Sequence, residues 1–401
     1  MILEQASIGR DNNFNLLRMV AASAVLVTHS FALQSGNPRN EPLEDALGMS
    51  LGGMSVDVFF VASGFLVTAS MLKRKSISDF ARARILRIYP AALVMCVLTV
   101  FLLGPLATTV GVIEYFQSLT TWKYFAKCAT LVAGVSFELP GVFASNPYPK
   151  AVNGSLWSMP WELRMYLLLV ALWGIACLGG SRREQWFRFG VVAFGVIGLI
   201  LGLAQEYVPF GRTEAFRLLA MFFIGGTLHV FASRISLRLW IGVGASALLL
   251  GAGLAGPHVF PAVWMLVAPY LVLWFAYVPG GFIRRYNHVG DYSYGTYIFA
   301  FPLQQLVMML KPDASVLTLT LLAGLGTLVF AMLSWHLIEK PCMALLSRKR
   351  PSNAAPTGQL LAQAYSRESF GESQSIGLVM SDHVARADTS IVPLEQVFRL
   401  D

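Results

Sequence analysis

Long apolar runs constrain this chain more than any other feature of its sequence. Hydrophobic residues make up 56% of its 401 residues and charged residues only 13%. The apolar residues gather in runs of roughly 18–25, each long enough for a helix to cross a bilayer. Because the backbone in lipid must satisfy its own hydrogen bonds, these runs predict helices. We expect an all-α, polytopic transmembrane bundle of about ten spans, at residues 14–34, 52–72, 88–106, 156–178, 189–205, 214–232, 236–255, 260–278, 293–310 and 316–338.

The basic residues are spread unevenly over the predicted loops. Lys and Arg gather in alternate loops, above all in 73–87, 182–188 and 340–350. Basic loops stay in the cytoplasm, so the pattern predicts that both termini are cytoplasmic. It also accounts for the net charge of +8 without a nucleic-acid partner.

The charge pattern also sets the domain organisation. We expect a cytoplasmic lead at residues 1–13, a membrane domain at 14–342 and a disordered cytoplasmic tail at 343–401. The apolar segment 122–139 would reverse every later loop if it crossed the membrane, so we interpret it as re-entrant or surface-bound. Four scattered cysteines predict neither a disulfide framework nor a metal site.

Two ionisable residues stand out in the first predicted span. Arg18 and His29 are eleven residues apart, which places them on one helix face about 16 Å apart along the axis. Ionisable groups inside a membrane are costly and usually mark a functional path. His29 is therefore a candidate general base, and a satisfied core histidine is the alternative.

The second predicted span carries one acid and a pair of small residues. Asp57 is either an interfacial residue that water reaches or the partner of a buried cation. Ser63 and Gly64 favour close helix packing. The glycines at 225 and 226 also fit close helix packing, and the histidine at 229 fits an interfacial position.

A basic stretch continues up to the third predicted span. Arg84 and Arg87 are i,i+3 neighbours on a helix, and Arg82 precedes them. Fixed guanidinium groups at the inner surface suit the phosphates of an anionic ligand. Acidic lipid headgroups are the alternative partners.

The fourth predicted span opens with a carboxylate among aromatic residues. Glu162 and Tyr166 share a helix face, while Trp157 and Trp161 suit an interfacial belt. A carboxylate at this depth can accept hydrogen bonds from a hydroxylated substrate. We expect Glu162 to orient either His29 or that substrate.

Taken in order, these segments resemble the acyltransferase 3 family of integral membrane acyltransferases. The resemblance covers about residues 12–342. It is carried by Leu17-Arg18 with His29, Val56-Asp-Val-Phe-Phe-Val-Ala-Ser-Gly-Phe65, Arg84-Ile-Leu-Arg-Ile-Tyr-Pro90, Ser155-Leu-Trp157 with Glu162 and Tyr166, Ser293-Tyr-Gly-Thr-Tyr297 and Glu339-Lys-Pro341.

The resemblance implies transfer of an acyl group, often acetyl, from acyl-CoA to hydroxyls of envelope or secreted glycans. The residues regarded as functional in the family map to Arg18, His29, Arg84 and Arg87. With the interpretations above, the expected catalytic residues are His29, Arg18 and Glu162. The expected acyl-CoA site is formed by Arg84, Arg87, Arg82 and Ser63. Ala300 stands where many relatives have a histidine before the proline of the ninth span.

The expected protein is therefore a multi-pass enzyme of the cell inner membrane that uses acetyl-CoA or another acyl-CoA and no metal. Its partners would be membrane lipid, acyl-CoA, a glycan or glycolipid acceptor and polysaccharide assembly proteins. His29 would act as general base or form an acyl-histidine intermediate. A multi-span anion or proton-coupled transporter is the main alternative, and a non-catalytic scaffold is another.

Overall fold

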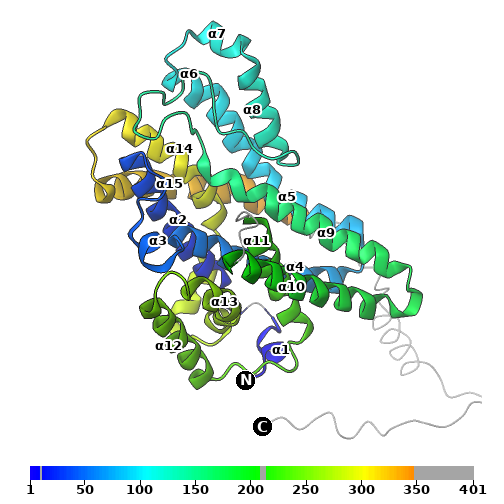
Figure 1. Cartoon of the computed structure of the whole chain (residues 1–401). Coiled ribbons are helices and arrows are strands. Elements are labelled where there is room, and N and C mark those ends of the chain that lie inside the picture. Colours follow the sequence, from blue (N-terminus) through cyan, green and yellow to red (C-terminus); the bar gives the residue numbers. More distant parts are fainter. Residues whose placement is uncertain (10, 208–213, 347–401) are drawn as a thin grey trace, which may run out of the picture. The chain divides into compact units, whose positions relative to one another are not determined.

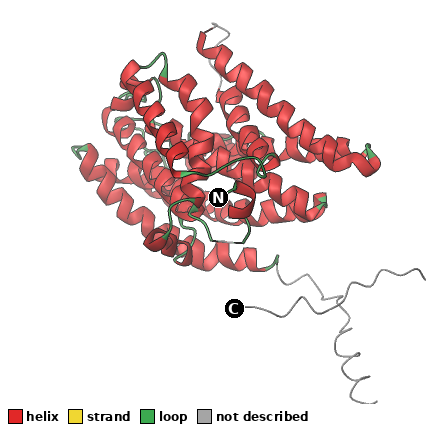
Figure 2. Ribbon diagram, turned by 90° about the horizontal axis from the view of Figure 1, so that it is seen from below, coloured by secondary structure: helices red, strands yellow, loops and turns green. Residues whose placement is uncertain are grey.

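The computed structural model describes residues 1–9, 11–207 and 214–346, and these residues form helices without a strand (Figure 2). Ten helices match the ten predicted spans (Figure 1). They are α2 (Phe14–Ser35), α4 (Leu51–Arg74), α5 (Ile77–Leu98), α9 (Met159–Cys177), α10 (Arg183–Tyr207), α11 (Glu214–Val230), α12 (Leu239–Ala255), α13 (Phe260–Tyr277), α14 (Ser293–Leu310) and α15 (Val316–Ser334).

Short helices fill the connections. The α-helical ones are α1 (Leu3–Ala6), α3 (Pro42–Leu47), α6 (Gly104–Ala107), α7 (Val112–Gln117), α8 (Leu119–Thr130) and α16 (Lys340–Ala344). The others are 3₁₀-helices at Gly154–Ser158, Gly180–Arg182 and Gly281–His288, and π-helices at Thr99–Leu103 and Trp335–Glu339. The predicted tail at 343–401 lies outside the described residues from 347 onwards.

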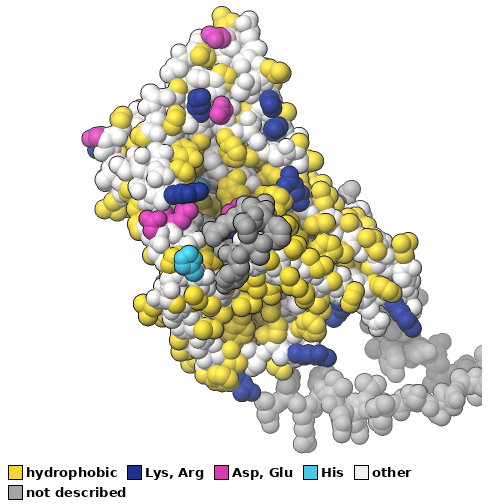
Figure 3. Space-filling view, viewed as in Figure 1, with side chains coloured by type: hydrophobic (Ala, Val, Ile, Leu, Met, Phe, Trp, Pro, Cys, Tyr) yellow, Lys and Arg dark blue, Asp and Glu magenta, His cyan; other side chains and the backbone are white. Residues whose placement is uncertain are grey.

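The predicted transmembrane bundle is confirmed. Among the described residues, seven helices are long and apolar enough to cross a membrane, and α12 is a shorter apolar helix. Large apolar side chains point outwards: Phe189 is 70% exposed, Leu250 73% and Leu325 67%. Figure 3 shows hydrophobic side chains over much of the lower half of one face, whereas most charged side chains lie in the upper half and at the lower rim. Such a surface suits lipid rather than water.

Contacts at and near the connecting segments divide the ends of the helices into two sets. In the first set, Lys75 Nζ lies 2.6 Å from a carboxylate oxygen of Glu184, and Arg82 donates a hydrogen bond to the Leu345 carbonyl oxygen. In the second set, Asn146 donates to the Gln305 carbonyl oxygen at 2.9 Å. The first set contains the basic links identified from the sequence. Its cytoplasmic location stays a prediction.

Small residues bring α4 and α11 together. A Cβ atom added to Gly64 would lie 1.8 Å from the Phe222 carbonyl oxygen, and one added to Gly225 would lie 2.3 Å from the Val61 carbonyl oxygen. Only glycine allows the two backbones to approach so closely. This packing fixes the position of Ser63 and Asp57, which also lie on α4.

The structure differs from the sequence expectation at the start of the third span, and it is compatible with the interpretation of segment 122–139 as re-entrant or surface-bound. The third span was expected to begin at residue 88, but α5 begins at Ile77, where Ser76 Oγ accepts a hydrogen bond from the Asp79 amide. Its basic residues therefore lie on a helix rather than in a loop. The segment 122–139 contains the end of α8, which has 12 residues and packs on α5, too short to span a bilayer.

Candidate functional site

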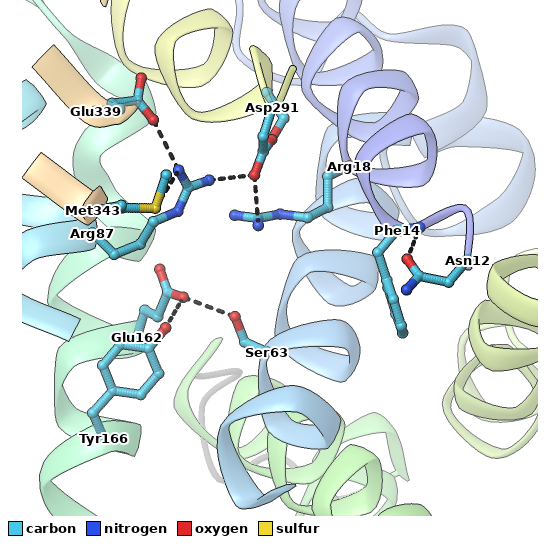
Figure 4. Close-up of polar contacts among 11 residues, drawn as sticks. Asn12, Phe14, Arg18, Ser63, Arg87, Glu162, Tyr166, Asp291, Glu339 and Met343 are labelled. Carbon is cyan, nitrogen blue, oxygen red and sulfur yellow. Dashed lines mark hydrogen bonds and ion pairs between the residues drawn. The ribbon is translucent and has the colours of Figure 1, made fainter. Parts of the chain in front are cut away.

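Two arginines from different spans converge on one buried carboxylate. Nη1 of Arg18, on α2, lies 3.1 Å from Oδ2 of Asp291, and Nη2 of Arg87, on α5, lies 2.5 Å from the same oxygen (Figure 4). Glu339 contacts Arg87 from the other side at 2.9 Å. The π-helix Trp335–Glu339 places this second carboxylate, and Ser334 donates a hydrogen bond to it. Four segments distant in the sequence thus meet in one ion-pair cluster.

The charge of Asp291 depends on this cluster. Asp291 lies in the link before α14, and its side chain is 9% exposed. Burial alone would raise its pKa, but the guanidinium groups of Arg18 and Arg87 outweigh burial and hold that pKa at about 2. The carboxylate is therefore ionised at physiological pH and compensates the two arginines.

Glu162 forms a second polar group beside the first. Ser63 Oγ donates to Glu162 Oε1 at 2.8 Å, and the Tyr166 hydroxyl donates to the same oxygen (Figure 4). The prediction that Glu162 and Tyr166 share a face is confirmed. Among the described residues, the Glu162 carboxylate accepts hydrogen bonds from Ser63 and Tyr166, and none joins it to His29. A role of Glu162 towards His29 or the substrate stays a prediction.

The three arginines of the predicted acyl-CoA site, Arg82, Arg84 and Arg87, differ in their contacts. Arg87 is neutralised by Asp291 and Glu339, whereas the buried Nε of Arg84 has no hydrogen-bond partner among the described residues. The Arg84 guanidinium carbon lies 5.9 Å from the centre of the Tyr166 ring. Arg82 donates to the Leu345 carbonyl oxygen at the surface. Arg84 therefore has the most donor capacity left for an anionic ligand.

Two narrow cavities surround these groups and share lining residues. The first, of about 60 Å³, is lined by Arg18, Arg84 and Glu162 among others. The second, of about 40 Å³, adds Ser158 and Tyr297, whose hydroxyl oxygens lie 2.6 Å apart. Arg18, Glu162 and Tyr294 line both cavities. Both cavities lie between α2, α4, α9 and α14, α5 also lines the first, and apolar side chains of α4 line much of the second.

His29 lines a third cavity, of about 240 Å³, which shares Val56 with the second. His29 Nδ1 lies 3.4 Å from Ser155 Oγ, on the 3₁₀-helix before α9, and its ring meets that of Phe301 edge-on. If Nδ1 carries its proton towards Ser155, Nε2 is the basic nitrogen. Shared lining residues thus relate the three cavities, whose linings contain Arg84, Arg18 and His29 in turn.

Sequence reasoning missed two residues of this region. Asp291 was not singled out, although an acid directly before a span is a signal that it pairs with a buried cation. Arg217 was not singled out either. Its Nη1 lies 2.7 Å from Oδ2 of Asp57, which also accepts a hydrogen bond from Trp264. Of the two interpretations of Asp57, the buried-cation partner is the one observed.

Within the described residues, no group of three or more His, Cys, Asp or Glu side chains is placed to hold a metal ion.

Comparisons with known proteins agree with the residue patterns. A family model described as an acyltransferase domain matches residues 11–336. The chain is similar to an O-acetyl transferase of Shigella phage Sf6, with 29% identity over 85% of this chain and 98% of the relative. It is also similar to nodulation protein 10 of Rhizobium leguminosarum bv. viciae, with 29% identity over 84% and 95% of the two chains. Acyltransferase MdmB of Streptomyces mycarofaciens is 23% identical over 77% and 85%. No solved structure shows a significant match.

Proposed function

Because this chain belongs to the acyltransferase 3 family, whose members are integral membrane acyltransferases, we propose that it is an acyl-CoA-dependent O-acyltransferase of the cell inner membrane. It takes an acyl group, acetyl in our proposal, from acyl-CoA on the cytoplasmic side. It passes that group to a hydroxyl of an envelope or secreted carbohydrate on the outer side. The similarity to acyltransferases favours an enzyme over the transporter and the scaffold.

The observation that supports this proposal is the set of three cavities, related by shared lining residues, that contain Arg84, Arg18 and His29 in their linings. A phosphate of the donor would bind the unpaired Nε of Arg84, with Arg82 nearby. The arm that bears the thioester would pass Arg18 and reach His29. Because the first two cavities hold only about 60 and 40 Å³, side chains must move to admit it.

The contact between His29 Nδ1 and Ser155 supports a chemical step at the other ring nitrogen, Nε2. Nε2 removes the proton of the acceptor hydroxyl, whose oxygen attacks the thioester carbonyl carbon. The carbon–sulfur bond breaks, and the protonated imidazole returns the proton to the departing thiolate of coenzyme A. Arg18 would steady the donor, and Asp291 fixes Arg18. An acyl-histidine intermediate would use the same nitrogen as nucleophile.

Membrane vesicles that contain the full chain test the proposed function. They are incubated with acetyl-CoA labelled in its acetyl group, and the carbohydrate fraction is treated with mild base. We expect base-labile label in carbohydrate, and none with vesicles from cells that lack the protein. Label that crosses the membrane without becoming covalently bound would instead support a transporter.

A further inference from the structure

A fourth cavity, of about 480 Å³, adjoins the His29 cavity. The two cavities share Ser50, Gly53, Glu214 and Arg217 in their linings. Ligand pockets usually measure about 300–1,000 Å³, so this cavity is large enough for a ligand, unlike the two narrow cavities around Glu162. Charged groups of both signs line it, namely Arg39, Glu44, Glu214 and Arg217.

Arg217 is held rigidly at the boundary between the two larger cavities. Its Nη1 contacts Asp57 Oδ2 at 2.7 Å and the Gly53 carbonyl oxygen at 3.1 Å. Its Nε donates to Glu214 Oε2 at 3.1 Å. The Asp57 side chain is 1% exposed and that of Arg217 is 12% exposed, whereas Glu214 is 55% exposed. The largely buried pair of Asp57 and Arg217 therefore holds the exposed carboxylate of Glu214 at the cavity.

The chemistry of this pair fits a neutral, hydroxyl-rich ligand. A carboxylate accepts hydrogen bonds from hydroxyl groups, and a guanidinium group donates to hydroxyl and ring oxygens. A carbohydrate offers both kinds of group. Because Glu44 and Glu214 balance Arg39 and Arg217 in the lining, the cavity has no excess of positive charge that would select a phosphate or carboxylate ligand. An apolar ligand would displace water from these charged groups without forming hydrogen bonds to them.

We propose that Glu214 and Arg217 bind the carbohydrate acceptor and position its reacting hydroxyl at His29. This inference rests on the proposed function and assigns its acceptor site. It gives Asp57 a supporting role, as the fixed anion that orients Arg217. It places acceptor binding at the start of α11 rather than at Glu162, which lines only the narrow cavities near the arginines.

The test compares Glu214→Gln with wild type in the labelled-vesicle assay, together with binding of coenzyme A to the purified full chain in detergent. Glu114→Gln, on the exposed helix α7, is the matched control. We expect Glu214→Gln to lower the initial rate of carbohydrate labelling at least about tenfold, as for loss of a hydrogen bond to a charged group. Coenzyme A binding should stay within about twofold of wild type, which a folding defect would not allow.

Two outcomes would overturn the assignment. Labelling by Glu214→Gln at the rate of Glu114→Gln would remove Glu214 from acceptor binding. Loss of coenzyme A binding together with labelling would make the residue structural. Absence of carbohydrate labelling with the wild-type chain would be a different result, because the proposed function itself would then fail and this inference with it.

Discussion

Asp291 compensates Arg18 and Arg87 at the same time, in a place that water scarcely reaches. Removing one partner of a buried ion pair leaves a charge uncompensated and typically costs about 3–5 kcal/mol. Asp291→Asn should therefore lower the free energy of unfolding by about this amount. Thermal unfolding in detergent measures it, with the exposed Asp313→Asn as control. Equal melting temperatures for the two variants would show that the cluster is not structural.

Arg84 has a different role in this account, because its buried Nε has no hydrogen-bond partner in the part of the chain that the structure describes. A hydrogen bond from a charged donor contributes about 1.5–3 kcal/mol. Arg84→Gln should therefore weaken coenzyme A binding by roughly 10- to 100-fold with little loss of stability. Equilibrium binding of labelled coenzyme A measures this, with Arg164→Gln, on α9, as control. Unchanged affinity would remove Arg84 from the donor site.

The sequence allowed individual residues to be selected but not their partners. Arg18 and His29 stood out because charge inside an apolar run is costly, and their common helix face followed from spacing alone. Asp291 lies far from both arginines along the chain, so its pairing depends on how the helices pack. The sequence likewise left open whether Glu162 orients His29 or the substrate, and only the packing of α4 against α9 shows that it accepts a hydrogen bond from Ser63.

The approach of α4 and α11 is the element contact that holds Asp57 beside Arg217. A side chain at Gly64 would meet the backbone of Phe222, and relief would require the helices to separate. Gly64→Ala should destabilise the protein by about 1–3 kcal/mol or more. Gly244→Ala, on α12 with open space around its Cβ position, should be neutral or stabilising by up to about 1 kcal/mol. Thermal unfolding of both variants compares them, and equal stability would contradict this packing role.

Helices could be predicted more completely than their ends. Ten apolar runs predicted ten helices, because length and hydropathy decide whether a segment can cross lipid. The start of α5 was misplaced because Ser76 caps a polar helical turn that no hydropathy signal marks. The π-helix that presents Glu339 to Arg87 likewise has no signature in the sequence. Both irregularities place charged residues of the site.

At the scale of the whole molecule, contacts at and near the connecting segments distinguish two sets of helix ends. The set with the basic segments is predicted to face the cytoplasm. Single cysteines can test this in a chain whose native Cys177 and Cys342 are replaced by serine. In intact cells, a membrane-impermeant thiol reagent should label Asp313→Cys and leave Arg182→Cys unlabelled until the cells are permeabilised. The reverse pattern would invert the topology and place Arg84 on the outer side.

The orientation matters to the proposal because donor and acceptor would reach the protein from different ends. We propose donor phosphate at Arg84, thioester at His29 and acceptor at Glu214, and each of these residues lines a cavity. The acyl group would then cross the membrane region while the coenzyme stays anchored on the basic side.

Turnover by the His29→Ala variant tests the central claim most directly. Purified full-length protein in detergent is given acetyl-CoA with an acetyl label, and thioester cleavage is followed beside coenzyme A binding, with the exposed His258→Ala as control. A general acid–base contributes about 10²–10⁴-fold. We expect His29→Ala to lose cleavage by at least about 100-fold while it binds coenzyme A like wild type and His258→Ala. Cleavage by His29→Ala at the wild-type rate would contradict the account.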